Sequence, residues 1–448
     1  RRHLQGRERR LALMGRLHSR TVDLAVSGTL LGLLGAVAVW NAFAYPPLGG
    51  FDAREHIAYA RDVLDGRLPE GGASYTPPGF YAVAALAIRL GEALRIDEPE
   101  HVVQILNALC VVGTGLLVLS FARLLFPGRP LARWSALGFF ACCPVVLKTG
   151  AMFHPQPLAM LLSVLALWIA TTMIVRRDYR FRIWAGLAVT LGGAQLVRSV
   201  SLWVVGVVVI TLVAAAVAQP EHRRRIGTAL AVSALAMVLL PLPWYIHLQS
   251  TAGNAILGRG MSLTAFQNPW PAAFYLYPGL PDVIAHPQRA ELGVGVIPIL
   301  YVETWGDYFG IWSWGPPRPE LTPRVDRRLA IQSIVGLPLT ILAVAGWLAL
   351  SVLAATRWRE APARIIVALA PLAGLAAVLF YTTRSFRPDG DTVKALFLLP
   401  AVPFWAISFG FAVDVLVQRS RRVGFVTLAV GALCLAVSLA YATFALVT

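Results

Sequence analysis

Residues 22–44 read Val-Asp-Leu-Ala-Val-Ser-Gly-Thr-Leu-Leu-Gly-Leu-Leu-Gly-Ala-Val-Ala-Val-Trp-Asn-Ala-Phe-Ala, and residues 49–56 read Gly-Gly-Phe-Asp-Ala-Arg-Glu-His. A predominantly apolar run of this length matches the roughly 20 residues that a helix needs to cross a bilayer. It exceeds the apolar core of a signal peptide, which spans roughly 7–15 residues, although Ala42-Phe43-Ala44 resembles a cleavage site. We therefore expect a retained membrane helix with an acidic residue, Asp52, directly beyond its end.

The composition extends this expectation to the whole chain. Of the 448 residues, 57% are hydrophobic and only 14% are charged, which is more apolar surface than a soluble chain of this length can bury. The formal net charge of +16 does not indicate a nucleic-acid partner, because the arginines cluster in short gaps between apolar runs. Membrane topology and anionic lipid headgroups account for such clusters. The sequence therefore predicts an all-α polytopic membrane protein.

Arginine-rich clusters set the predicted topology. They lie at residues 1–20, 123–133, 176–182, 222–225, 357–364 and 419–422. If all of them face the cytoplasm, an even number of crossings separates each pair. Three apolar segments lie between the first two clusters, so one of them does not cross; we expect this of residues 79–94, which are short and follow a Pro-Pro pair. The chain then crosses about eleven times, with the N-terminus in the cytoplasm and the C-terminus outside. The predicted crossings lie near residues 22–44, 102–122, 131–148, 157–176, 182–198, 200–218, 226–247, 329–355, 364–383, 394–416 and 423–447.

This topology divides the chain into three parts. Residues 1–247 form an N-terminal membrane module that includes a first outer loop at 45–101. Residues 248–328 form an outer loop rich in aromatic residues, and residues 329–448 supply the C-terminal membrane helices. The polar residues of interest therefore collect on the outer, extracytoplasmic face.

Asp52 precedes a segment with helical periodicity at 54–65. Its carboxylate has two interpretations: an N-cap of that helix, or a general base that faces a cleft at the boundary of water and lipid. Glu55 and His56 follow closely and are candidates for substrate binding. No cluster of His, Asp and Glu in this segment has the firm spacing of a metal site, and a divalent cation stays open as a cofactor.

The first outer loop contains a recognisable pattern. Asp-x-x-x-His, Tyr-Ala and Gly-x-Leu-Pro occur within 52–69, and Tyr-Thr-Pro-Pro-Gly-Phe-Tyr follows at 75–81. This order resembles the first outer loop of GT-C glycosyltransferases, membrane enzymes that depend on polyprenyl-phosphate sugars and include protein mannosyltransferases and lipid A aminoarabinose transferases. The resemblance implies a GT-C fold with amphipathic surface helices in this loop and Asp52 as the catalytic residue. Ala53 occupies the usual second acidic position, which puts a two-carboxylate mechanism in doubt.

Two later segments resemble motifs of the same class. Leu-Val-Arg-Ser at 196–199 is similar to a helix ending in which the cation meets a lipid phosphate. Lys-Ala-Leu-Phe-Leu-Leu-Pro-Ala-Val-Pro at 394–403 is similar to a late helix with the pattern Lys-x-Arg-Tyr-Leu-Leu-Pro-x-x-Pro, although Leu-Phe replaces its Arg-Tyr pair. The resemblance implies that Arg198 and Lys394 bind the phosphate of the donor.

Physical chemistry supports these two roles and leaves an alternative for each. A cation at membrane depth costs roughly 2.5–3.5 kcal/mol on insertion scales, so it usually has a partner. For Arg198 the alternative to a phosphate is snorkelling to the outer interface. For Lys394 the alternative is a local ion pair with Asp389 or Asp391.

Three further residues are candidates for substrate binding. His154 opens a Phe-His-Pro-Gln-Pro turn, where related enzymes commonly carry a second polar residue, although a histidine in a turn is often structural. Glu303 and Asp307 are four residues apart in an aromatic-rich segment. Two interpretations stay open: the aromatic residues of this segment, such as Trp312 and Trp314, form a belt at the membrane interface, or the acidic pair lines an acceptor pocket.

The sequence therefore predicts an inverting glycosyltransferase, either a hexosyl- or a pentosyltransferase. It would move a sugar from a polyprenyl-phosphate donor to the hydroxyl of a glycan, lipid or protein acceptor on the outer membrane face. Nucleotide sugars stay in the cytoplasm, and the chain has no nucleotide-binding motif, which favours a lipid-linked donor. One alternative is a transporter or flippase, which places ionisable residues near the bilayer midplane. The other is a non-catalytic binder of lipid-linked sugars.

Overall fold

The computed structural model describes residues 2–69, 74–253, 271–285, 287, 295–306, 323–384 and 393–443. Within these ranges only the backbone is described at 2–20, 200, 252, 323–326 and 384. Every regular element in the described ranges is a helix, and no strand occurs there. The predicted all-α class is therefore confirmed.

Most of the predicted crossings are long apolar helices. These are α1 (Arg2–Ala44), α4 (His101–Leu125), α7 (Gln156–Arg176), α16 (Pro323–Thr356), α17 (Arg364–Arg384), α18 (Val402–Arg419) and α19 (Arg421–Ala442). The remaining one is the stretch Pro220–Thr251, in which α10 (Arg223–Leu239) is flanked by η2 (Pro220–His222) and α11 (Leu242–Ala252). In the described chain, eight helical stretches are long and apolar enough to cross a membrane, which indicates an integral membrane protein. A bent pair, α5 (Pro130–Ala141) and α6 (Pro144–Ala151), makes a ninth when it is counted as one span.

Two further predicted crossings are shorter helices. α8 (Phe181–Val197) and α9 (Leu202–Ala218) are apolar, but each has 17 residues. Each of the predicted crossings thus coincides with a helix or with the bent pair, and the total of about eleven stays a prediction. The pair α5–α6 bends by 50° at Pro144, which has no backbone N–H and begins the new helix as proline commonly does.

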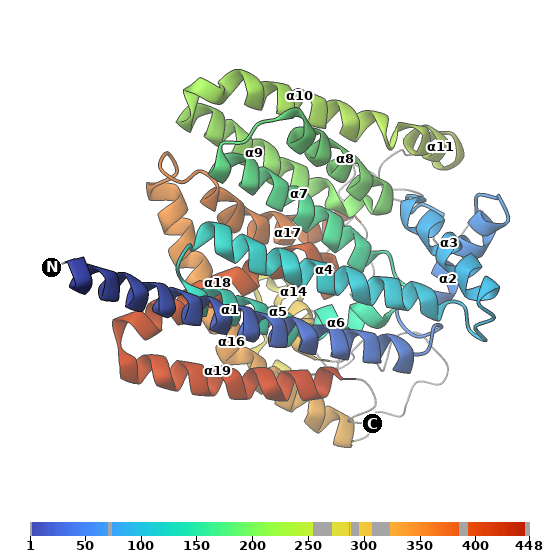
Figure 1. Cartoon of the computed structure of the whole chain (residues 1–448). Helices are drawn as coiled ribbons and strands as arrows, with labels where there is room; N and C mark the ends of the chain where they lie inside the picture. The colour runs from blue at the N-terminus through green and yellow to red at the C-terminus, as the bar shows by residue number, and fades with distance from the viewer. Residues whose placement is uncertain are drawn as a thin grey trace.

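The first outer loop folds into two amphipathic helices. α2 (Ala53–Leu64) and α3 (Gly79–Ala93) lie together at one end of the bundle, beside the start of α4 (Figure 1). Their buried faces form an apolar cluster that is separate from the main core and is centred on Tyr59, Phe80 and Tyr81. α3 is not among the described helices that are long and apolar enough to cross, in agreement with the expectation for residues 79–94.

The two ends of the bundle are distinguished by the course of the chain. α1 begins at one end, whereas α19 finishes at the other, where α2 and α3 also lie (Figure 1). The side-chain amide of Asn41, near the end of α1, donates to the carbonyl oxygen of Ala442 at 2.9 Å, so the last turns of α1 and α19 are neighbours. An odd number of crossings fits this arrangement. We call the end that carries α2 and α3 the loop end and the opposite one the arginine end.

Close helix packing fixes the segment that precedes α18. α18 packs tightly on α5 because Gly410 has no side chain: a Cβ atom there would clash with the carbonyl oxygen of Ala132. Small residues allow membrane helices to approach in this way. The 3₁₀ segment η3 (Ala395–Ala401) runs directly into α18, so it is held at the loop end of the bundle.

Candidate functional site

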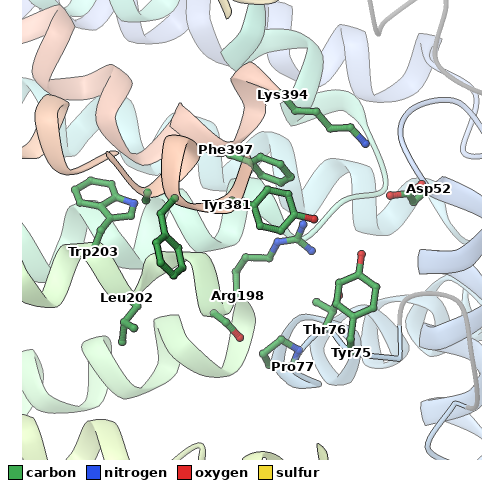
Figure 2. A pocket seen from close by; sticks show the side chains of 13 residues that line it. Asp52, Tyr75, Thr76, Pro77, Arg198, Leu202, Trp203, Tyr381, Lys394 and Phe397 are labelled. Atoms are coloured by element: carbon green, nitrogen blue, oxygen red, sulfur yellow. The ribbon is translucent and has the colours of Figure 1, made fainter. Parts of the chain in front are cut away.

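A pocket with a volume of about 400 Å³ opens at the loop end (Figure 2). It is lined by Asp52, Tyr75, Thr76, Pro77, Arg198, Ser199, Leu202, Trp203, Ala377, Phe380, Tyr381, Lys394 and Phe397. Asp52, Arg198 and Lys394 come from distant parts of the chain, and the sequence singled out all three. The fold therefore brings the predicted base and both predicted phosphate ligands to one cavity.

Asp52 stands immediately before α2 but does not cap it through its side chain. Its backbone is left-handed, with φ 52° and ψ 22°, and its carboxylate makes no capping hydrogen bond. The helix begins instead with the N–H of His56 donating to the carbonyl oxygen of Asp52 at 2.9 Å. The N-cap interpretation is thus wrong for the side chain, which is exposed and points into the pocket (Figure 2). A left-handed residue other than glycine costs about 1–3 kcal/mol, and such strain clusters at functional sites.

Arg198 lies where α8 stops. Its extended backbone, with φ −158° and ψ 119°, ends the helix and turns the side chain into the pocket (Figure 2). The guanidinium carbon lies 5.7 Å from the centre of the Phe397 ring, which fits a cation–π contact. Among the described residues, no carboxylate lies within ion-pair distance of Arg198, so its charge is available to a ligand.

Lys394 immediately precedes η3 and is 8% exposed. Its ammonium nitrogen lies 4.2 Å from the centre of the Phe51 ring, which places it beside the residue that precedes Asp52. Asp389 and Asp391, the predicted alternative partners, lie outside the described residues. Figure 2 shows the polar tips of Lys394 and Asp52 pointing toward the same space.

The segment before α3 supplies another part of the lining, and a glycine puts it there. A Cβ atom on Gly79 would lie 2.7 Å from the carbonyl oxygen of Leu196, so only glycine lets α3 approach the end of α8 this closely. Tyr75 and Thr76 thereby come next to Arg198. The hydroxyl of Tyr59 on α2 donates to the carbonyl oxygen of Thr76 at 3.1 Å and ties this segment to α2.

His56 and His154 lie outside the lining, in a buried cluster next to it. Each is 2% exposed, and their rings meet edge to face with centroids 4.9 Å apart. The Nδ1 atom of His56 is hydrogen-bonded to the hydroxyl of Tyr81 at 2.7 Å, and that of His154 accepts from the N–H of Gln156 at 3.1 Å. These contacts fit a structural support of the pocket better than the direct substrate binding expected from the sequence.

Burial is the main cause of the charge state of both histidines. It holds the pKa of His56 well below its usual value, and the nearby cations Arg198 and Lys394 lower it further. The pKa of His154 is lowered in the same way, first by burial and then by His56 and the same two cations. Both imidazoles are therefore neutral at pH 7.

The three remaining candidates differ in position. Glu55 is exposed on the first turn of α2, and partial burial, then the charge of Asp52, raises its pKa. Glu303 is 1% exposed on α14 (Val296–Trp305), and its Oε2 atom accepts from the N–H of Ala395 at 2.7 Å. Neither carboxylate belongs to the lining. Asp307 lies outside the described residues.

The opposite wall of the pocket is apolar. It consists of Leu202 and Trp203 from α9, Ala377 and Phe380 from α17, and Phe397 from η3. Leu202 and Phe380 are 51% and 45% exposed, so this wall continues to the outside of the bundle. No motif marked α17 as part of the site, and the sequence did not predict its contribution, which includes Tyr381.

The described part of the chain contains no group of three or more His, Cys, Asp or Glu side chains that could hold a metal ion. Asp52 is the only acidic residue in the lining of the pocket. The chemistry that the lining itself offers is that of one carboxylate, two cations and several hydroxyl groups.

The chain is similar to known proteins in the sequence of one segment and in the fold of nearly its whole length. A family model for dolichyl-phosphate-mannose-protein mannosyltransferase matches residues 76–247, which include Arg198. No curated protein sequence matches the chain. The matched segment covers the surface helix α3, the crossings from α4 to α10 and the end of α8, so it contains one side of the pocket.

Solved structures match nearly the whole chain at low identity. The apo oligosaccharyltransferase of Archaeoglobus fulgidus has a TM-score of 0.59 at 14% identity, over 94% of this chain and 56% of its own. ArnT from Cupriavidus metallidurans bound to undecaprenyl phosphate has a TM-score of 0.52 at 15% identity, over 92% of this chain and 63% of its own. AglB from Archaeoglobus fulgidus, in complex with an inhibitory peptide and a dolichol-phosphate, has a TM-score of 0.54 at 13% identity, over 96% of this chain and 56% of its own.

These matches confirm the predicted resemblance to the GT-C glycosyltransferases, and the chain has their fold. It spans less than two thirds of the length of each of these solved structures.

Proposed function

We propose that the protein transfers a sugar from a polyprenyl-phosphate donor to an acceptor hydroxyl, with inversion at the anomeric carbon. The observation that carries this proposal is a single pocket in which Asp52, Arg198 and Lys394 meet an apolar wall. The family model and the polyprenyl-phosphate ligands of the structurally similar proteins support it. A polyprenyl phosphate is complementary to this pocket, because its anionic head matches the two cations and its apolar chain matches the apolar wall.

Arg198 and Lys394 bind the phosphate of the donor. Charge-assisted hydrogen bonds from such cations are about twice as strong as neutral ones. The prenyl chain lies along the apolar wall and leaves the pocket past Leu202 and Phe380, the two half-exposed residues of that wall. The donor can thus enter from the bilayer while its sugar reaches Asp52.

Asp52 acts as the general base. Its carboxylate takes the proton of the acceptor hydroxyl as the hydroxyl oxygen bonds to the anomeric carbon. The bond between that carbon and the phosphate oxygen breaks, and its electron pair stays on the departing phosphate. The two cations stabilise the added negative charge. Attack opposite the leaving phosphate inverts the anomeric centre.

The reaction takes place on the extracytoplasmic face. The arginine-rich clusters near residues 123–133 and 419–422 lie at the end of the bundle opposite the pocket. Basic loops face the cytoplasm in most membrane proteins, so the pocket faces outward. The partners are then a lipid-linked hexose or pentose donor and a glycan, lipid or protein that offers a hydroxyl.

The test is sugar transfer by purified protein in nanodiscs, from a panel of polyprenyl-phosphate sugars to hydroxyl acceptors, with and without EDTA. We expect Asp52→Asn to lower the rate by about 10²- to 10⁴-fold, the usual contribution of a general base. Asp62→Asn is a matched control, because Asp62 lies on the same helix α2 and pairs with Arg67 at 3.2 Å, away from the lining. It should leave the rate unchanged.

Transfer by folded Asp52→Asn at the wild-type rate would exclude Asp52 as the base. A product that retains the anomeric configuration, measured by NMR, would exclude the single-step mechanism. Donor binding without transfer from any sugar of the panel would favour a binder of lipid-linked sugars instead.

A further inference from the structure

Glu303 is a buried carboxylate outside the pocket that contacts the chain segment carrying Lys394. It is 1% exposed, and its Oε2 atom accepts a hydrogen bond of 2.7 Å from the N–H of Ala395, a residue 92 positions further along the chain. Ala395 follows Lys394 directly. Burial of a carboxylate destabilises the fold unless hydrogen bonds compensate for the lost water. The hydrogen bond from Ala395 is one such compensation.

The helix that carries Glu303 is itself held firmly. On one side of Glu303, the hydroxyl of Tyr301 donates to the carbonyl oxygen of Ser333 at 2.5 Å. On the other side, the indole N–H of Trp305 donates to the hydroxyl of Thr340 at 2.8 Å. Both partners belong to α16, a long helix of the bundle. α14 is thus fastened to α16 on both sides of Glu303, and the carboxylate is a fixed point.

The segment that Glu303 holds supplies two parts of the pocket. Lys394 precedes η3 and provides one cation. Phe397 within η3 supports the other, because the guanidinium carbon of Arg198 lies 5.7 Å from the centre of its ring. A shift at Ala395 therefore moves one cation directly and removes the support of the other.

We infer that Glu303 is a positioning residue for the donor phosphate: its hydrogen bond to the N–H of Ala395 fixes Lys394 and Phe397, and through them both phosphate-binding cations. This inference rests on the proposed function, because it assigns Glu303 to the donor half of the reaction. It replaces the acceptor contact that the sequence suggested for this residue.

The test measures the affinity of wild type and variants for undecaprenyl phosphate in detergent micelles, without any transfer reaction. We expect Glu303→Ala to weaken binding about tenfold or more, since the loss of a hydrogen bond to a charged group has an effect of that size. Glu303→Gln keeps a carbonyl oxygen that accepts from Ala395, so it should bind within about threefold of wild type.

A second variant removes the N–H of Ala395, which donates the hydrogen bond, and leaves the carboxylate of Glu303 in place. Ala395→Pro deletes the N–H, and proline is tolerated there because Lys394 has an extended backbone, with φ −133° and ψ 124°, and Ala395 begins η3. It should weaken binding as much as Glu303→Ala does. The double variant Glu303→Ala with Lys394→Ala should bind more strongly than the product of the two single effects predicts, because part of the effect of Glu303→Ala is exerted through Lys394.

Asp414→Ala is the matched control for the loss of a buried carboxylate. Asp414 is 4% exposed on α18 and pairs with Arg129 at 3.0 Å, about 18 Å further along the helix axis than the start of α18. This variant should lower the melting temperature and leave the affinity unchanged.

The results separate the two proposals. Failure of wild type to bind undecaprenyl phosphate would overturn both the proposed donor and the role of Glu303. Wild-type binding with equal affinity in Glu303→Ala and Ala395→Pro would overturn the role of Glu303 alone. Equal weakening by Glu303→Gln and Glu303→Ala, or effects of Glu303→Ala and Lys394→Ala that multiply, would also overturn it.

Discussion

At the arginine end of the bundle, Asp23 and Asp414 pair with arginines, whereas at the loop end Asp52 and Arg198 face a pocket. Asp23 on α1 accepts from Arg133 at 2.8 Å and from the indole of Trp134 at 3.0 Å. In the described chain, neither Asp52 nor Arg198 has an ion-pair partner, although both line the same cavity. Unpaired charges of opposite sign gathered in one cavity are typical of functional sites.

The hydrogen bonds around the pocket show the same contrast. The backbone and aromatic groups around Asp52 are tightly connected, but the carboxylate is left without a capping bond. At the arginine end the carboxylate of Asp414 accepts from both Arg129 and Gln418. The comparison teaches that the loop end holds the backbone around Asp52 in place and leaves its carboxylate uncapped, whereas the carboxylate of Asp414 is held by its own hydrogen bonds.

Among tests of this contrast between the two ends, the largest effect is expected from removing an arginine at each end. Arg198→Ala should lower sugar transfer by about 10²- to 10³-fold, because one preorganised donor to the developing charge is lost. Arg133→Ala should leave transfer per folded protein unchanged but lower the melting temperature, because Asp23 loses a buried partner. Rates and melting curves on the same samples check both. Equal losses of activity in the two variants would end the contrast between the ends.

The next effect is the dependence of stability on pH. The pKa values of His56 and His154 are lowered mainly by burial, so the unfolded chain binds protons that the folded one does not. The contribution of the two neutral histidines to the free energy of unfolding should be fully present above the usual pKa of 6.5. It should fall as pH drops below that value, by up to about 1.4 kcal/mol per pH unit for each histidine. Melting temperatures of wild type and His56→Gln between pH 7.5 and roughly pH 5 measure it. Parallel curves would contradict the prediction, since the variant should lose less stability in acid.

A smaller effect is expected from the hydroxyl of Tyr81. Tyr81→Phe removes the hydrogen bond of 2.7 Å to His56 but keeps the stacking on Tyr59, whose ring centroid is 3.7 Å away. The free energy of unfolding should fall by about 1 kcal/mol. Transfer should fall only a few-fold, as for a support that touches no substrate. Tyr59→Phe, which loses the bond to Thr76, serves as the comparison; a drop in rate as large as that of Asp52→Asn would assign Tyr81 to the chemistry itself.

The smallest effect is expected from Glu55. Its carboxylate is exposed and lies outside the lining, so Glu55→Gln should change the transfer rate by less than about threefold. The rate at neutral pH beside that of Asp52→Asn measures the difference. A loss comparable to that of Asp52→Asn would instead favour a two-carboxylate mechanism.

The helices and part of the site could be predicted because they leave local patterns. A crossing needs a long apolar run, so segments such as 102–122 and 157–176 mark α4 and α7 directly. Arg198 and Lys394 interrupt or begin such runs, where a cation is unusual enough to indicate a partner. Asp52 follows a crossing directly, which placed it at the membrane surface.

The remainder depends on contacts that the sequence does not record. His56 was expected to face substrate, but the rotation of α2 turns it inward against Tyr81. Glu303 was expected to line an acceptor site, but α14 packs between α16 and η3 and directs it to Ala395. Tyr381 lies in an unremarkable stretch of α17, and only the packing of α17 against α9 brings it to the pocket.

The central claim is that the pocket at the loop end holds a lipid phosphate between Arg198 and Lys394. An experimental structure of the protein with undecaprenyl phosphate tests it most directly. We predict phosphate oxygens within hydrogen-bond distance of both cations and the prenyl chain against Trp203 and Phe380. A phosphate bound elsewhere, with the side chains of Arg198 and Lys394 turned away from it, would contradict the account.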